Sequence, residues 1–163
     1  PLLCKITAGP SKFKSIKNWN YITCDLNSPL ADIKADICKL PFKNFEFDLI
    51  ICNHVLEHID NDFKAMEEIY RVLKKNGIGI LQVPIDESLS ITFEDKTIID
   101  PKIKSELFGQ YDHVRKYGKD FYDRLKSVGF KVKKIDVQKN WSEKEIKEYS
   151  LPKYEKIPFV IKS

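Results

Sequence analysis

Short apolar segments that suit β-strands alternate along this chain with segments that suit helices, and this order is the feature that most constrains its fold. The clearest strand covers residues 47–52, a nearly continuous apolar run typical of a strand buried on both faces. The clearest helix follows over residues 60–75, with apolar residues at helical spacing. Strands that alternate with helices predict an α/β fold with a mainly parallel sheet and helices on both faces.

Turn residues close the other expected elements. We expect further strands at residues 2–8, 21–24, 33–35, 78–83, 130–137 and 158–161, and further helices at residues 11–18, at residues 119–128 and after Ser142. Asp60 is the expected cap of the long helix, and Asn76 and Gly77 mark its end. No strong helical pattern separates the last two strands, so we expect them to pair antiparallel.

Residues 85–117 lack clear periodicity and are expected to form one long loop. A loop of this length inside a compact domain is uncommon, and such loops often cover an active site.

Composition favours one globular domain over residues 1–163. Hydrophobic residues make up 42% of the chain and charged residues 32%, with a net charge of +4. The lysines are dispersed among acidic residues, which argues against a nucleic-acid partner. Four cysteines without a C-x-x-C pair indicate free thiols in the cytoplasm. No apolar run is long enough to span a bilayer, and a chain that opens on Pro1 suggests that residues precede it.

Two of the first three expected strands end in an aspartate, Asp25 and Asp36. Ligands of open α/β sheets bind beyond the carboxyl ends of the strands. One carboxylate there can accept both hydroxyls of a ribose, and a second can accept the exocyclic amine of a purine. The alternative is that these aspartates only favour turns, but the pair together favours a nucleoside ligand.

Four stretches in this order resemble class I S-adenosylmethionine-dependent methyltransferases. They are YITCDL at 21–26, ADICKLPF at 35–42, FDLIICNHVLEH at 47–58 and AMEEIYRVLKKNG at 65–77. The late stretch QYDHVRKYG at 110–118 is also similar to a loop of some of these enzymes. The resemblance implies a Rossmann-like, doubly wound sheet of seven strands with an antiparallel last strand, and S-adenosylmethionine as cofactor.

The resemblance also implies roles for individual residues. Asp25 would bind the ribose, and Asp36 with the backbone of Ile37 would bind the adenine. Asn53 and His54 would lie beside the methionine part and the transferred methyl group.

The first loop departs from the family pattern. Class I enzymes have a G-x-G-x-G-type loop there, whereas this chain has Ala8 and Gly9 followed by Pro10. Ala8 and Gly9 are the expected cofactor-binding residues of this loop, although Pro10 removes one N–H donor.

Methyl transfer depends mainly on alignment, with a base where the acceptor must lose a proton. His54 and His113 are the expected catalytic residues, whereas His58 is expected to pack or cap. The expected acceptor-binding residues are Asp86, Asp112, Arg115 and Tyr117. We expect no metal site, because the spacing of His54 and His58 is not that of H-E-x-x-H.

The sequence therefore predicts transfer of a methyl group from S-adenosylmethionine to a small or medium-sized acceptor. Two alternatives remain: a non-catalytic domain of the same fold with a binding or partner-interaction role, and a nucleotide-binding enzyme of another chemistry. The acceptor atom and the oligomeric state stay open.

Overall fold

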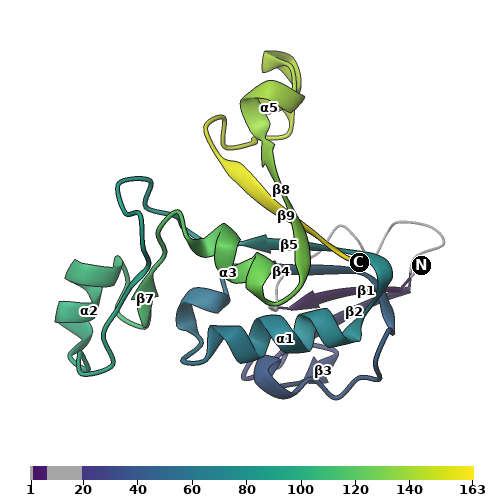
Figure 1. The fold of residues 1–163 in the computed structure, drawn as a ribbon, viewed down its shortest axis with the longest axis horizontal. Helices are drawn as coiled ribbons and strands as arrows, with labels where there is room; N and C mark the ends of the chain where they lie inside the picture. Colours follow the sequence, from purple (N-terminus) through teal and green to yellow (C-terminus); the bar gives the residue numbers. More distant parts are fainter. Residues whose placement is uncertain (1, 7–19) are drawn as a thin grey trace.

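The computed structural model describes residues 2–6 and 20–163, and it forms a twisted seven-stranded sheet with the order β3-β2-β1-β4-β5-β9-β8 (Figure 1). The strands are β1 Leu2–Ile6, β2 Asn20–Asp25, β3 Ile33–Lys34, β4 Phe47–Asn53, β5 Leu73–Gln82, β8 Phe130–Asp136 and β9 Lys156–Lys162. The first five strands pair in parallel, whereas β9 is antiparallel to both β5 and β8. The predicted α/β fold, with its mainly parallel sheet and antiparallel end, is confirmed.

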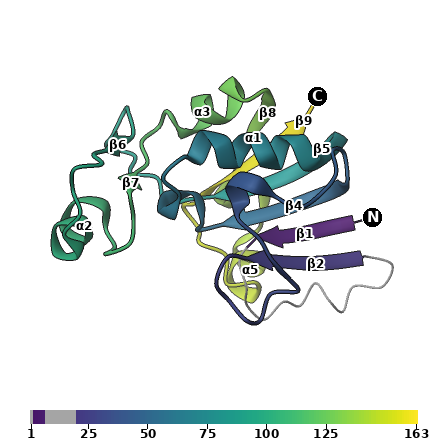
Figure 2. The same cartoon turned by 90° about the horizontal axis from the view of Figure 1, so that it is seen from below.

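Helices α1, Asp62–Val72, and α3, Phe121–Ser127, lie on one face of the sheet (Figures 1 and 2). Helix α1 buries Ala65, Met66 and Ile69 completely against the sheet, and β4 supplies Phe47 and Ile50 to the same core. Burial of these side chains is the main stabilising term for such an arrangement. The expected helix over residues 11–18 lies outside the described residues.

The ends of α1 differ from the expectation. Asn61, not Asp60, is the N-cap, because the Asn61 side chain accepts a hydrogen bond from the backbone N–H of Lys64. The helix ends at Val72 because the backbone N–H groups of Phe45 and Glu46 bind the carbonyls of Arg71 and Val72. Strand β5 therefore begins at Leu73, earlier than predicted.

The expected loop over residues 85–117 is wrong in part, because it contains secondary structure. Strands β6, Phe93–Glu94, and β7, Arg115–Lys116, pair antiparallel, and helix α2, Pro101–Phe108, lies between them. Asp100 caps α2 through bonds to two backbone N–H groups, and Gly109 ends it with a φ of 92°. These short elements project from one end of the sheet (Figure 1).

Two short helices follow β8. Helix α4, Val137–Asn140, was not predicted, whereas α5, Glu143–Glu148, begins with the expected capping box of Ser142 and Glu145. Short helical 3₁₀ turns, η2 at Ile37–Lys39 and η3 at Leu56–His58, follow β3 and β4. Among the described helices, none has the length and apolar character needed to cross a membrane.

Candidate functional site

A cavity of about 260 Å³ opens at the carboxyl ends of β1 and β2, where the sequence predicts a nucleoside ligand. We call it the Asp25 cavity. Its lining includes Asp25, Asp36 and Ile37, with His58 on the side toward β4. The structure thus brings together three of the predicted cofactor residues, because parallel strands place their carboxyl ends at one edge of the sheet. Ala8 and Gly9 lie outside the described residues.

Both aspartates of the Asp25 cavity also hold local turns. Asp25 Oδ1 accepts hydrogen bonds of 2.8 Å from the backbone N–H groups of Asn27 and Ser28. Asp36 Oδ1 accepts a 2.8 Å bond from the N–H of Cys38 and so caps η2. Each aspartate therefore fixes the turn that follows its strand and also lines the Asp25 cavity.

A charged clamp fixes the segment that follows Asp36. Glu68 of α1 accepts a hydrogen bond from the N–H of Leu40, and Arg71 donates to the carbonyls of Leu40 and Phe42. The Arg71 guanidinium lies 2.8 Å from Glu68 and lowers the pKa of that carboxyl. The ionised pair ties the wall of the Asp25 cavity to α1.

Asn53 and His54 stand at the end of β4 but border a different cavity. That cavity has a volume of about 430 Å³ and lies against the sheet, lined also by Lys5, Gln82 and Glu155. His54 has a φ of 54°, a left-handed conformation that costs energy in a residue other than glycine. Its side chain is 59% exposed, and Nδ1 lies 3.3 Å from Glu57 Oε1.

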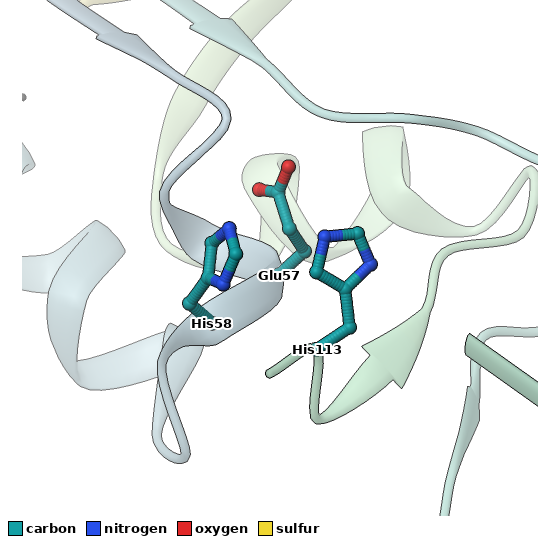
Figure 3. Close-up of side chains that lie close together, drawn as sticks. All are labelled: Glu57, His58 and His113. Carbon is teal, nitrogen blue, oxygen red and sulfur yellow. The ribbon is translucent and has the colours of Figure 1, made fainter. Parts of the chain in front are cut away.

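The strained turn at His54 leads directly into η3, where Glu57 and His58 meet His113 from the distant loop before β7 (Figure 3). One potential ligand atom from each of these three residues lies within 4.8 Å of the other two. The rings of His58 and His113 meet edge to face, with centroids 4.7 Å apart. We call this group the imidazole cluster. In the sequence, the spacing of Glu57 and His58 beside His54 was weighed as a ligand pattern and discounted, and Glu57 was not among the expected site residues.

A third cavity, of about 480 Å³, borders the imidazole cluster on the side of residues 84–86 and 108–116. We call it the His113 cavity, and its lining includes Glu57, His113 and Asp86. Hydrogen bonds from Ser88 and then from Lys116 lower the pKa of Asp86, which keeps it charged. Asp112 instead pairs with His58, at 3.2 Å from its Nδ1.

The structure gives Arg115 and Tyr117 a framework role, whereas the sequence predicts contact with the acceptor. Arg115 is 2% exposed and donates to the carbonyls of Leu56, Ile59 and Asp60, although it also reaches the edge of the His113 cavity. Tyr117 is fully buried and donates a 2.8 Å hydrogen bond to Asp62. Burial, with Asp62 nearby, raises the pKa of Tyr117 well above its ordinary value.

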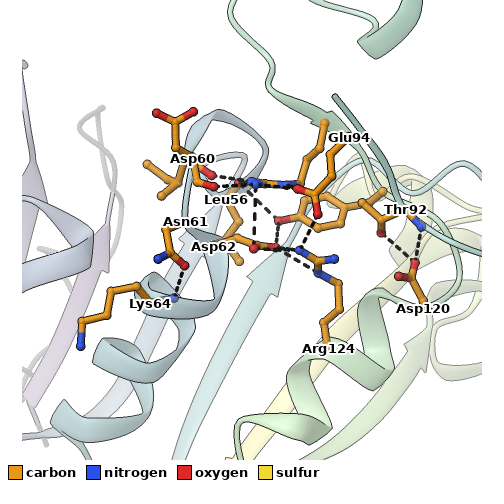
Figure 4. A network of polar contacts seen from close by, with 12 residues as sticks. Leu56, Asp60, Asn61, Asp62, Lys64, Thr92, Glu94, Asp120 and Arg124 are labelled. Atoms are coloured by element: carbon orange, nitrogen blue, oxygen red, sulfur yellow. Dashed lines mark hydrogen bonds and ion pairs between the residues drawn. The ribbon is translucent and has the colours of Figure 1, made fainter. Parts of the chain in front are cut away.

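The buried Asp62 and the exposed Glu94 complete this group, which we call the Arg115 network (Figure 4). Arg124 of α3 lies 2.8 Å from Asp62, and Arg115 lies 3.0 Å from Glu94. The network joins η3 and α1 to the antiparallel pair β6–β7 and to α3, so it positions the loop that carries His113.

Comparison with known proteins finds similarity to a family over part of the chain. Residues 14–81 match the model of a family described as a methyltransferase domain. Two uncharacterised proteins of Methanocaldococcus jannaschii are 40% identical over 103 residues and 38% identical over 105 residues, or 58% and 61% of this chain. The chain spans only 40% and 47% of their lengths.

Solved structures share the fold over nearly the whole chain. A SAM-dependent methyltransferase of Archaeoglobus fulgidus matches 98% of this chain and 84% of its own, with a TM-score of 0.57 and 14% identity. A Haloferax volcanii structure of the Trm112 methyltransferase activator with a methyltransferase matches 99% and 82%, with a TM-score of 0.63 and 12% identity. The class I methyltransferase fold expected from the sequence is confirmed.

Proposed function

We propose that this chain, a domain with the class I methyltransferase fold, transfers a methyl group from S-adenosylmethionine to a small or medium-sized acceptor. The observation that carries the proposal is the Asp25 cavity, where two strand-end aspartates face one hollow beside His58. The match of residues 14–81 to a methyltransferase domain supports both the reaction and the cofactor.

The residues of the Asp25 cavity fit the adenosine part of that cofactor. The Asp25 carboxylate would accept the ribose hydroxyls, and Asp36 would accept the adenine amine beside the N–H of Ile37. Ile6 and Val55 give the cavity apolar walls for a flat base. Ala8 and Gly9 of the first loop and Asn53 and His54 after β4 complete the proposed cofactor contacts.

When bound, the cofactor supplies an electrophilic methyl group on a sulfonium, so the protein mainly aligns the acceptor. We place the acceptor in the His113 cavity, which Asp86, Lys116 and Glu57 line. Arg115 borders it and holds η3 through the carbonyl of Leu56, whereas Asp112 acts from outside its lining by holding His58 in place. Tyr117 acts there through Asp62 rather than by contact.

A proton leaves the acceptor during many such transfers, and His54 and His113 are the proposed bases. Glu57 lies 3.3 Å from His54 Nδ1, which orients that ring in the manner of a base and its supporting carboxylate. His113 is held by the carbonyl of Phe108, 3.0 Å from its Nδ1. His113 can therefore present Nε2 to an acceptor in the His113 cavity, whereas His54 stands at the neighbouring cavity beside Asn53 and Gln82.

Titration calorimetry with S-adenosylmethionine and S-adenosylhomocysteine tests the proposal. We expect binding by the wild-type chain, and Asp25→Ala should weaken it about tenfold or more, as for loss of a charged hydrogen bond. Asp25→Asn keeps an oxygen for the N–H groups of Asn27 and Ser28, so it separates loss of the carboxylate from loss of the turn. Asp95→Asn, an exposed aspartate outside the Asp25 cavity, is the matched control.

Absence of binding by the wild-type chain would contradict the proposal and favour a non-catalytic domain of this fold. Equal affinities for wild type and Asp25→Ala would remove Asp25 from the site.

A further inference from the structure

The imidazole cluster has the chemistry of a metal site, beginning with its two histidines. His113 Nδ1 lies 3.0 Å from the carbonyl oxygen of Phe108, which can only accept, so Nδ1 carries the proton. Nδ1 of His58 lies 3.2 Å from Asp112 Oδ2. In both rings Nε2 is left with its lone pair. Metal-binding histidines are held in this way, with one nitrogen on a carbonyl or carboxylate and the other on the ion.

Glu57 supplies a carboxylate that the protein itself does not satisfy. The residue is 1% exposed, and its Oε1 contacts His54 Nδ1. Its Oε2 is buried and has no hydrogen-bond partner. A buried carboxylate oxygen without a partner costs free energy, and native structures keep few such groups without a reason. The Glu57 carboxylate lies beside the two imidazoles (Figure 3).

The spacing of the three ligand atoms suits an ion between them after a small closure. They lie within 4.8 Å of one another. Bonds of about 2.0–2.2 Å from nitrogen and oxygen to zinc place ligands roughly 3–4 Å apart, so closure by about 1 Å is sufficient. The His58 side chain is 28% exposed and has room for this rotation.

We propose that Glu57, His58 and His113 bind one divalent transition-metal ion, for which Zn²⁺ is the best fit. Two imidazoles and one carboxylate form a ligand set that binds zinc and its first-row neighbours in preference to magnesium or calcium. Three protein ligands leave a coordination position open, as in catalytic zinc sites. Glu57 and His113 line the His113 cavity, so the open position faces it.

This placement also names a class of acceptor, a step that rests on the proposed function. His58 lines the Asp25 cavity as well, so the ion would lie between the cofactor and the His113 cavity. An open position on zinc binds oxygen ligands and favours their ionised form. The site therefore selects an acceptor with a hydroxyl or carboxylate oxygen. With His113 on the ion, His54 remains as the base.

Calorimetry on metal-free, untagged protein tests the site with ZnCl₂ and CoCl₂, in the absence of cofactor. We expect saturable binding of one ion per chain, and Co²⁺ should give visible absorption bands of a low-coordinate site. His58→Ala and His113→Gln should weaken binding about 100-fold or more, since loss of a residue that only supports a metal ligand by a hydrogen bond already weakens binding roughly 10–100-fold. Asp112→Asn should weaken it about tenfold through His58.

Cys38→Ser is the matched control, because Cys38 is a partly exposed thiol outside the imidazole cluster that could bind zinc by itself. The affinity of the Cys38→Ser variant for Zn²⁺ should equal that of the wild type. Circular dichroism of each variant confirms that it folds, and partly exposed His58 keeps the test valid if the buried His113 variant unfolds.

The chain has only three histidines, so NMR of the imidazole nitrogens assigns the ligands directly. Zn²⁺ should shift the Nε2 signals of His58 and His113 and leave that of His54 nearly unchanged. Absence of saturable binding, or equal affinities in wild type and His58→Ala, would overturn the metal site. Binding of S-adenosylmethionine is measured without metal, and binding of Zn²⁺ is measured without cofactor. Failure of the metal site can therefore be told apart from failure of the proposed function.

Discussion

Two groups of polar side chains join the same two parts of this chain, and they differ in how completely their charges are paired. The Arg115 network and the imidazole cluster both link the turn after β4 to the loop around β7. In the network both Asp62 oxygens accept hydrogen bonds, from Arg124 and Tyr117. In the cluster the buried Glu57 Oε2 accepts none.

This difference separates a framework from a binding site. A network in which every buried charge is paired holds its segments together without further help. A cluster with a buried, unpaired oxygen between two oriented imidazoles is costly in isolation and is completed by a cation. The Arg115 network holds the loop that carries His113, and this places His113 next to Glu57 and His58 in the imidazole cluster.

The largest effect is expected when the framework is broken at Asp62. Asp62→Asn keeps the size of the side chain but removes the charge between Arg115 and Arg124, which lie 3.9 Å and 2.8 Å from it. The free energy of unfolding should fall by about 3 kcal/mol, as for other broken buried pairs. Urea unfolding followed by circular dichroism measures the change.

Asp123→Asn is the control for Asp62, because Asp123 forms an exposed pair with Lys126 and is 74% exposed. Its unfolding free energy should change by about 0.5 kcal/mol or less. Equal losses in both variants would mean that the buried network stabilises no more than a surface pair.

The sheet could be predicted from sequence because its signals are local. Residues 47–52 show burial directly, and the capping box at Ser142 and Glu145 is contained in four residues. The strand-end aspartates were also placed correctly in one cavity, since parallel topology fixes where strands end.

The imidazole cluster could not be predicted in the same way. His113 reaches Glu57 and His58 only through the fold of residues 85–117, in which β6 and β7 have two residues each and no visible period. The end of α1 was missed for a related reason, because distant backbone N–H groups of residues 45 and 46 end it. The burial of Arg115 and Tyr117 could not be predicted either, since the polar type of a residue does not show whether it is buried.

An intermediate effect is expected for the half-buried clamp at the other end of α1. Glu68→Gln removes a charge that binds Arg71 and the N–H of Leu40, and should lower the unfolding free energy by about 1–2 kcal/mol. The hydrogen bond from Arg71 lowers the pKa of Glu68 below 4.5. Its stabilisation is therefore present above pH 4.5 and is lost as the pH falls through the lowered pKa.

Unfolding of Glu68→Gln and wild type across pH 3 to 7 measures this linkage. The difference between them should be largest near neutrality and shrink below about pH 4.5. A difference that stays constant with pH would show that the carboxylate charge does not matter, and the clamp would rank with neutral hydrogen bonds.

The smallest effect on stability is expected at Glu57 of the imidazole cluster, where removal of the charge should not destabilise the protein as it does in the Arg115 network. Glu57→Gln removes a buried charge whose Oε2 has no partner, so in metal-free buffer the unfolding free energy should stay unchanged or rise by about 1 kcal/mol. Glu94→Gln is the matched control, since Glu94 is a framework carboxylate bound to Arg115 and Arg124, and it should destabilise. Urea unfolding in the presence of EDTA measures both variants without metal. In a second series without EDTA, added Zn²⁺ should stabilise the wild type but not Glu57→Gln. If Glu57→Gln lost as much stability as Asp62→Asn, Glu57 would belong to the framework, and the distinction between the two groups would fail.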